Sequence, residues 1–271
     1  MKTRLIIGAA LIAAAAFGAL IAGQAAAQSK SSQAESSERP FSKMEEDEIR
    51  MIVREYLAEH PEVIIEAINI YAEREREADA ARALAGAQAN LSTLLDERNG
   101  FITGAKPASA KVAVIEFFDY HCAFCKRAVD IVQDLTTSDP DVKVVFREFP
   151  ILREESQYAA EIALAAREQG KYRDLHFALM KTKGVMPPDR VNAIARSAGL
   201  NVRALESARK DPSIAAAIGE TYRIADEMGV EGTPAFVVAT LDGDYVRVVS
   251  GYYPNELAAA IKEAKAAAGT R

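Results

Sequence analysis

The sequence predicts a mixed α/β domain with an inserted helical subdomain, preceded by a helical N-terminal segment. Three observations lead to this fold class: strand-like and helix-like segments alternate after Lys111, a long helical stretch interrupts them, and two helical segments come before them. The chain has 271 residues, of which 49% are apolar and 27% charged. This composition is globular, and the length suits one large domain or two smaller ones.

Charge and cysteine content narrow the classes of function. The formal net charge is -6, with 33 basic and 39 acidic residues, and the basic residues are scattered, so we expect no nucleic-acid partner. The only cysteines are Cys122 and Cys125, which excludes a disulfide-rich scaffold and a four-thiolate zinc site. Two thiols separated by two residues are left as the candidates for chemistry.

The first 41 residues divide into a signal peptide and a leader. Two basic residues precede an apolar run over 5–22, and Ala25 and Ala27 form an A-x-A site, so we expect residues 1–27 to be cleaved during secretion. An uncleaved membrane anchor is the alternative, because 18 apolar residues approach the spanning length. Residues 28–41 are rich in Ser, Gln and Glu, which predicts a flexible leader in an oxidising space outside the cytoplasm.

A helical segment is expected over residues 42–100. Ser42 and Glu45 fit a capping box at the start of a short amphipathic helix, and Pro61 suits the first position of a second helix. The second helix is predicted to run to an Asn-Gly pair at 99–100, which makes it roughly 55 Å long. Its apolar seam consists of Ile64, Ile68, Tyr71, Ala78, Ala85 and Leu91.

The apolar seam of the second helix needs a covering surface. One possibility is the domain that follows in the same chain. The other is a set of further copies of the chain, for which residues 42–100 would form an oligomerisation stalk. The heptad pattern is interrupted by Glu75 and Arg82, so the pattern alone leaves both possibilities open.

Strands and helices alternate from Lys111 onward. Val112–Phe118 is β-branched and aromatic, residues 122–135 have helical periodicity, and residues 142–149 are again strand-like. A strand–helix–strand unit of this kind predicts two parallel strands joined by a right-handed crossover.

The rest of the domain is predicted to be a helical insertion, a hairpin and a final helix. Residues 151–229 carry helical spacing broken by glycines and a proline, and a loop of that length is implausible. Two strands over 235–240 and 245–250, joined by an Asp-Gly turn, are expected to form an antiparallel hairpin. A helix over 256–268 follows it.

The two cysteines lie where a predicted strand ends and a helix begins. Cys122 is at the helix N-terminus, where unpaired N–H groups and the helix macrodipole favour a thiolate. Cys125 lies one turn further on the same face, so it can attack a mixed disulfide formed at Cys122. Lys126 and Arg127 would add positive potential beside the thiolate, with ordinary solvated charge as the alternative.

A structural disulfide and a metal site are the alternatives for the cysteine pair. A bridge that closes so short a loop constrains little chain entropy. A tetrahedral zinc would need two more ligands from His60, His121 and His176, which show no paired spacing. We therefore expect no metal and no bound cofactor, only a redox-active disulfide between Cys122 and Cys125.

Two motifs carry a family resemblance. Residues 116–126, EFFDYHCAFCK, resemble the active-site segment of the DsbA-like thiol:disulfide oxidoreductases, and residues 232–236, GTPAF, resemble their cis-proline loop. The resemblance covers about residues 105–268 and implies a thioredoxin fold with a helical insertion for the domain 105–271. It also implies a periplasmic location, secreted or periplasmic cysteine-containing proteins as substrates, and a membrane redox partner.

The resemblance further implies roles for single residues. Pro234 would be cis and lie against the cysteine pair, which leaves the backbone of Thr233 open to an extended substrate segment. Ala123 and Phe124, between the cysteines, are expected to contact substrate as well. Glu116 resembles the buried acid that handles the proton of the second thiol, and a strand of Val, Ile and Phe around it should raise its pKa. A salt-bridged structural Glu is the alternative.

One departure from the family affects the expected redox behaviour. Oxidising members often have a histidine immediately before the second cysteine, where this chain has Phe124, which offers neither charge nor a strong donor. The reduced form should therefore be less favoured and the pair a weaker oxidant. His121, on the other side of the motif, is expected together with Lys126 to tune the thiolate and to compensate in part, and a solvent-facing histidine before the helix is the alternative.

A second resemblance concerns residues 44–71. This segment, with REYL at 54–57 and PEVI at 61–64, is similar to the N-terminal extension of the copper-sensitivity suppressor C proteins. Members of that group oligomerise through the extension and some are disulfide isomerases, which implies a homotrimer through residues 43–98. The prediction is a periplasmic thiol:disulfide oxidoreductase with isomerase activity. A monomeric dithiol oxidase and a copper-handling or chaperone-like binding protein are the alternatives.

Overall fold

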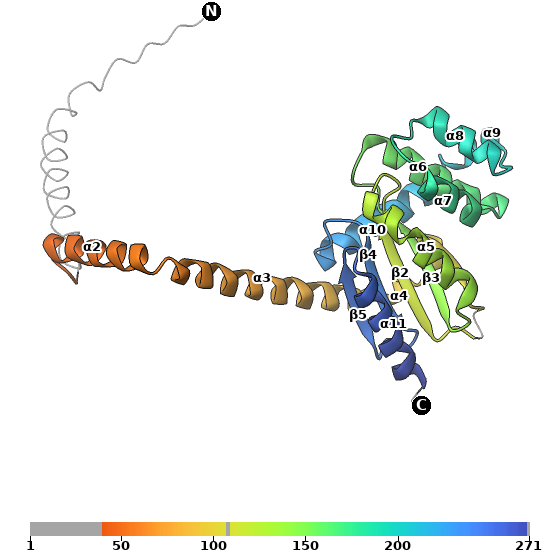
Figure 1. Ribbon diagram of the computed structural model, residues 1–271. Coiled ribbons are helices and arrows are strands. Elements are labelled where there is room, and N and C mark those ends of the chain that lie inside the picture. Colours follow the sequence, from red (N-terminus) through yellow and green to blue (C-terminus); the bar gives the residue numbers. More distant parts are fainter. Residues whose placement is uncertain (1–39, 107–108, 270–271) are drawn as a thin grey trace, which may run out of the picture. The chain divides into compact units, whose positions relative to one another are not determined.

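The computed structural model describes residues 40–106 and 109–269 (Figure 1). The expected signal peptide at 1–27 and the expected leader up to residue 39 lie outside the described residues. The chain divides into two units, one ending at Tyr71 and one beginning at Ala72. Among the described residues, no helix combines the length and apolar character needed to cross a bilayer.

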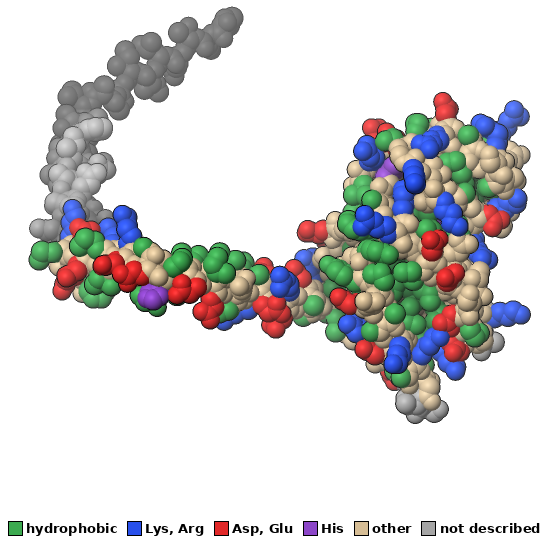
Figure 2. Space-filling view, viewed as in Figure 1, with side chains coloured by type: hydrophobic (Ala, Val, Ile, Leu, Met, Phe, Trp, Pro, Cys, Tyr) green, Lys and Arg blue, Asp and Glu red, His purple; other side chains and the backbone are tan. Residues whose placement is uncertain are grey.

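The first unit contains helix α2 (Lys43–Glu59) and the beginning of α3 (Glu62–Ala89). The predicted capping box is present: the Glu45 N–H donates to Ser42 Oγ at 3.4 Å, and the Ser42 N–H donates to the Glu45 carboxylate at 2.7 Å. No residue of α2 is buried. Figure 2 shows apolar side chains along this part of the chain. Its exposed large apolar residues include Met44, Met51, Ile52, Tyr56, Ile64, Ile65, Ile68 and Tyr71.

Helix α3 is shorter than the sequence suggested. It ends at Ala89, so its length is roughly 42 Å, and the expected continuous helix to residue 98 is wrong. The break lies at Asn90, whose side-chain amide donates to Gly86 O at 2.9 Å and, outside the helix, to Glu227 Oε2 at 2.8 Å. The chain continues through α4 (Leu91–Leu94) and the 3-10 turn η1 (Glu97–Asn99).

The C-terminal half of α3 packs inside the second unit. Ala83 and Ala87 are buried, whereas Ala78 and Ala85 of the expected seam are exposed. A Cβ on Gly86 would lie 2.9 Å from the Cα of Met228, so the helix backbone approaches its neighbour closely. An interface between copies over the whole of 43–98 is therefore too long, because this chain's own domain covers its C-terminal part.

The second unit is built on a five-stranded sheet in the order β1-β3-β2-β4-β5. As predicted, β2 and β3 pair in parallel, and β4 and β5 form an antiparallel hairpin. Sequence reasoning missed β1, which pairs antiparallel with β3 at one edge. The strands are β1 (Phe101–Gly104), β2 (Val112–Phe118), β3 (Val142–Glu148), β4 (Ala235–Thr240) and β5 (Val246–Ser250).

Helices cover both faces of the sheet (Figure 1). Alternate residues of β2 divide between two apolar clusters: Val112 and Val114 lie with α5 (Ala123–Ser138) and α11 (Pro254–Gly269). Ala113 and Ile115 lie with α3, α4 and α10 on the opposite face. All seven residues of β2 are buried, as expected for a central strand covered on both sides.

The residues expected to form a helical insertion are helical in the structure. The chain leaves the sheet after β3 and returns with α10, whose Ile224 and Met228 are buried against the sheet. The helices are α6 (Glu154–Ala165), the short η2 (Ala166–Gln169), α7 (Tyr172–Lys181), α8 (Pro188–Ser197), α9 (Val202–Ala208) and α10 (Pro212–Met228).

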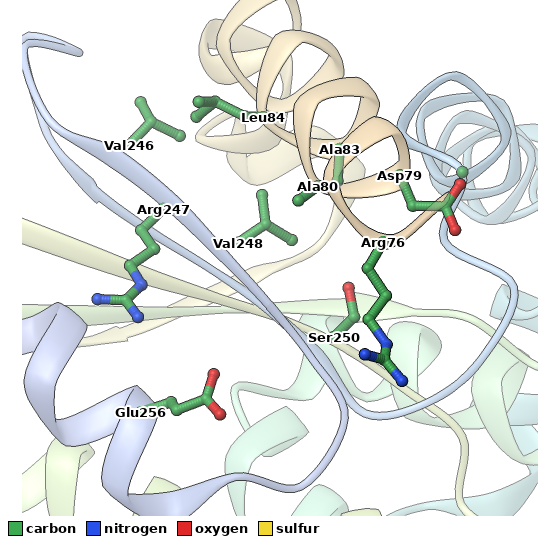
Figure 3. Close-up of a pocket in the computed structure, with 11 residues that line it drawn as sticks. Arg76, Asp79, Ala80, Ala83, Leu84, Val246, Arg247, Val248, Ser250 and Glu256 are labelled. Atoms are coloured by element: carbon green, nitrogen blue, oxygen red, sulfur yellow. The ribbon is translucent and has the colours of Figure 1, made fainter. Parts of the chain in front are cut away.

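A hollow of about 650 Å³ lies between α3 and β5 (Figure 3). Ala80, Ala83 and Leu84 of α3 face Val246 and Val248 of the edge strand across it. Neither cysteine lines this hollow. Both lie at the N-terminus of α5.

Candidate active site

Cys122 is the N-cap residue of α5. The chain leaves β2 at Phe118, makes a short loop and enters the helix at Ala123, and the Cys125 N–H donates to Cys122 Sγ at 3.4 Å. The pKa of Cys122 is lowered to about 6, first by a hydrogen bond with the Cys125 side chain and then by the Thr233 side chain and the backbone N–H groups of Cys125 and Phe124, although burial opposes this. Cys122 is therefore largely a thiolate at neutral pH.

Cys125 has the opposite character. It lies one helical turn after Cys122 and is buried, and both cysteines are free thiols in the structure. Burial raises the pKa of Cys125 well above that of a free thiol, and the hydrogen bond with Cys122 and the charge of Glu116 raise it further. One thiol of the pair is thus ready to attack, while the other stays protonated.

Glu116 lies on β2, opposite Phe236 of β4, and its side chain is buried. Burial raises its pKa to about 8, with a further contribution from the charge of Cys122. Among the described residues Glu116 forms no ion pair, so the geometry does not favour the alternative of a salt-bridged structural Glu. A carboxyl group with this pKa can exchange a proton near neutral pH.

The loop at residues 232–234 meets the cysteine pair. The Thr233–Pro234 peptide bond is cis, as the resemblance implied, and it directly precedes β4. Cys122 Sγ lies 3.1 Å from the backbone oxygen of Thr233, to which it donates a hydrogen bond when it is protonated, across more than a hundred residues of sequence. The fold therefore brings both motifs to one place.

Phe124 is 51% exposed, and Ala123 beside it is exposed too. The guanidinium carbon of Arg127 lies 5.1 Å from the centre of the Phe124 ring, a cation–π distance. The residues between the cysteines therefore present apolar surface next to the sulfur of Cys122.

Lys126 and His121 both turn toward the insertion. Lys126 Nζ donates to the backbone oxygens of Leu179 and Met180, at 3.3 and 3.2 Å, where α7 ends. The side chain of His121 is only 3% exposed, so the alternative of a solvent-facing histidine does not hold. Burial lowers the pKa of both groups.

Sequence reasoning missed the buried polar residues around the loop. Asp119 accepts hydrogen bonds from the His121 N–H at 2.6 Å and from the Ser156 hydroxyl at 2.8 Å. Tyr120 donates to Glu148 at 3.0 Å. Glu148 also accepts from Tyr172 at 2.8 Å, and burial raises its pKa. The polar residues next to the cysteine motif could have indicated such a network. Their hydrogen-bond partners, however, lie in β3, α6 and α7, far away in the sequence.

The candidate metal ligands are not gathered in the structure. Within 40–106 and 109–269, no group of three or more His, Cys, Asp or Glu side chains is arranged to hold a metal ion. His176, one of the histidines weighed as a zinc ligand, is buried, and burial lowers its pKa to about 3. Its Nδ1 lies 3.1 Å from the Tyr120 hydroxyl, in the polar group around Glu148.

The chain is similar to solved structures over most of their length. It is 39% identical to a thioredoxin-like oxidoreductase from Silicibacter pomeroyi, with 64% of this chain and 95% of that chain covered and a TM-score of 0.58. It is 31% identical to BcfH from Salmonella enterica Typhimurium, with 82% of this chain and 96% of that chain covered and a TM-score of 0.68.

Among curated proteins, the chain is 31% identical over 163 residues to one described as Na(+)/H(+) antiporter NhaA 1 from Salinispora arenicola. The match covers 58% of this chain and 25% of that protein, so the chain spans about a quarter of the length of this relative.

Residues 45–78 match the family described as the copper resistance protein ScsC N-terminal domain. Residues 113–262, more than half of the chain, match the DSBA-like thioredoxin domain, and the chain therefore belongs to the DsbA-like thioredoxin family.

Proposed function

We propose that the protein is a thiol:disulfide oxidoreductase that acts on cysteine-containing proteins in the periplasm. The observation that carries this proposal is the opposite behaviour of two thiols one turn apart. The pKa of Cys122 is lowered to about 6, whereas that of Cys125 is raised. A structural disulfide would not need this asymmetry, but a nucleophile with a resolving thiol does.

The proposed reaction begins on the reduced enzyme. The Cys122 thiolate attacks one sulfur of a substrate disulfide, the substrate S–S bond breaks, and the other substrate sulfur leaves as a thiolate. The result is a mixed disulfide between Cys122 and the substrate. Ala123, Phe124 and the backbone of Thr233 are the proposed contacts for the substrate segment, because they surround Cys122.

Two outcomes are open to the mixed disulfide. In isomerisation, another thiolate of the same substrate attacks it, a new substrate disulfide forms, and Cys122 leaves as a thiolate. In reduction, Cys125 attacks Cys122 after giving its proton to Glu116. The Cys122–Cys125 disulfide then forms and the substrate leaves with both of its sulfurs reduced. Oxidation is the reverse sequence, and a membrane redox partner is proposed to reset the cysteine pair.

We further propose that the first unit assembles several copies, as a homotrimer. Large apolar side chains are exposed along α2 and the start of α3, and a surface of this kind marks an interaction site. The match of residues 45–78 to the ScsC N-terminal domain supports the same assignment. Several thiolates held near one substrate would raise their effective concentration, which favours isomerisation over a single oxidation.

The redox proposal is tested by blocking the step in which Cys125 attacks the mixed disulfide at Cys122. In a Cys125→Ser variant, Cys122 still attacks but nothing on the enzyme displaces the substrate, so mixed disulfides with cysteine-containing proteins should accumulate. The matched control is Cys122→Ser, which keeps one thiol but removes the nucleophile, and it should trap none. Equal trapping by both variants, or by neither, would contradict the assignment of roles.

A further inference from the structure

The residue before the attacking cysteine is held by hydrogen bonds at both ring nitrogens. His121 Nε2 lies 3.0 Å from the backbone nitrogen of Met186, and Nδ1 lies 2.9 Å from the hydroxyl oxygen of Ser156. Met186 lies between α7 and α8, and Ser156 lies in α6. His121 therefore joins the cysteine loop to two separate parts of the insertion.

The donor and acceptor roles in this chain of bonds follow from one fixed proton. A backbone N–H can only donate, so the Met186 N–H requires a lone pair on His121 Nε2. The ring proton is then on Nδ1 and is donated to Ser156. Ser156 in turn donates its own hydroxyl proton to Asp119 Oδ1, 2.8 Å away. The imidazole in this arrangement is neutral, and burial, which lowers its pKa, acts in the same direction.

A neutral histidine with both nitrogens in use offers no charge to the thiolate. No hydrogen bond between His121 and Cys122 is present among the described residues, and the thiolate takes its stabilisation from Cys125, Thr233 and backbone N–H groups. The expectation that His121 tunes the thiolate thus has no contact to carry it. The bonds of His121 point to a different task, which is to hold the insertion against the loop.

The segments held in this way present apolar surface. Val185, next to Met186, is 41% exposed although Met186 itself is fully buried. Leu152 is 49% exposed, and its backbone N–H donates to Asp119 Oδ2 at 2.9 Å. The Asp119–Ser156–His121 chain of hydrogen bonds therefore fixes two exposed apolar side chains from outside the cysteine motif relative to the loop that carries Cys122.

We propose that His121 is a positioning residue for protein substrates. It fixes the Val185–Met186 segment beside the cysteine loop, so that an apolar stretch of an unfolded protein meets a preformed surface when its disulfide reaches Cys122. The proposal rests on the proposed oxidoreductase function. A small disulfide needs only the sulfur of Cys122 and makes little use of that surface, which separates a positioning role from a role in thiolate chemistry.

The experiment uses a pair of substitutions that differ in which nitrogen they imitate. The amide of Asn in His121→Asn reaches the place of Nδ1 and can bond Ser156, but nothing accepts the Met186 N–H. The longer side chain in His121→Gln brings an amide oxygen to the place of Nε2, where it can accept the Met186 N–H.

Second-order rate constants of the reduced full-length enzyme are measured with scrambled ribonuclease and with glutathione disulfide. The thiolate absorbance of Cys122 is followed against pH.

In His121→Asn, the rate with scrambled ribonuclease should fall about three- to tenfold relative to the rate with glutathione disulfide, the size expected for one lost buried hydrogen bond. His121→Gln should restore most of the ratio. His60→Asn makes the same replacement in the first unit and should leave the ratio at the wild-type value. If His121→Asn does not fold, Ser156→Ala, which breaks the middle of the chain of bonds, takes its place.

Two results would overturn the inference. Equal losses with both substrates, together with a raised pKa of Cys122, would return His121 to the role of tuning the thiolate. An unchanged ratio in a folded His121→Asn variant would leave it with no positioning role. A wild-type enzyme that exchanges with neither substrate would instead refute the proposed function, so the two failures are distinguishable.

Discussion

The two halves of α3 differ in what they do with their apolar side chains. Before Ala72 the helix exposes large ones, among them Ile64 and Ile68. After that point it buries small ones, Ala83 and Ala87, and brings a glycine against α10. The chain's own domain covers the C-terminal half of the seam. The N-terminal half stays exposed in the single chain, and it is the half that the proposed assembly of copies would cover.

Side-chain size, as well as spacing, distinguishes a helix face that packs on its own domain from one that is left exposed. Close helix packing selects Gly and Ala, because a larger group would collide with backbone, as Gly86 would with Met228. Isoleucines that are exposed at helical spacing are not limited in size by a neighbouring backbone. They are typical of an interface whose other side is absent from the single chain.

Removal of residues 1–71 should have the largest effect on the protein. The protein that begins at Ala72 retains the sheet, α10 and the cysteine pair, so it should be monomeric with its thiol exchange intact. Isomerase activity should be lost, because single thiolates no longer share a substrate. Light scattering and refolding of a scrambled disulfide protein measure both effects. A monomeric full-length protein, or equal isomerase rates, would contradict the assembly proposal.

Gly86→Leu tests the buried half. A Cβ there would come within 2.9 Å of Met228, so α3 must shift away from α10, and the free energy of unfolding should fall by about 3 kcal/mol. Chemical denaturation of the protein that begins at Ala72 measures this without the assembly. Ala85→Leu is the matched control: its site is exposed although the expected seam included it, so the change should stay within about 0.5 kcal/mol.

Ile68→Lys tests the exposed half. The side chain is 58% exposed in the single chain, so the monomeric second unit should lose no stability. If copies associate here, each interface loses a buried apolar side chain worth about 1.5–3 kcal/mol, and the dissociation constant should rise at least tenfold. Analytical ultracentrifugation over a range of concentrations gives the constant. Unchanged association would move the interface away from this face of α3.

The smallest expected difference concerns the pH dependence of Cys122. Its pKa of about 6 should be the same with and without residues 1–71, because the groups that lower it all lie in the second unit. Alkylation rates should follow the thiolate with a midpoint near pH 6 in both proteins, with Cys125 unlabelled. A midpoint that moves on truncation would show that the first unit contributes to the site.

The same pKa has a consequence for stability. A free thiol titrates near 8.5, so the pKa of Cys122 is depressed on folding. The thiolate therefore stabilises the reduced protein fully above about pH 8.5, and this contribution is lost as the pH falls through about 6. Glu116 has the opposite sign: its raised pKa contributes stability below about pH 4.3 that is lost as the pH rises through about 8.

Much of this arrangement could be read from the sequence. The β2–α5–β3 unit, the hairpin and the place of Cys122 follow from local patterns that tertiary contacts reinforce. β1 could not be predicted, because four residues ending in a glycine are too short to show a period of two. The end of α3 was missed because Asn90 bonds a residue 137 positions away. The burial of His121 depends likewise on Met186.

The hydrogen bonds of the cysteine loop to Ser156 and Met186 limit the transfer of the motif to other proteins. The seven residues from Asp119 to Cys125 could replace the corresponding residues of another thioredoxin scaffold in a single substitution of sequence. Without an equivalent of Ser156 and Met186, however, the buried Asp119 carboxylate would lose one of its hydrogen-bond donors and the His121 imidazole would lose both of its partners, and each loss penalises folding. A designer, or a recombination event, would have to move the loop and the insertion as one piece.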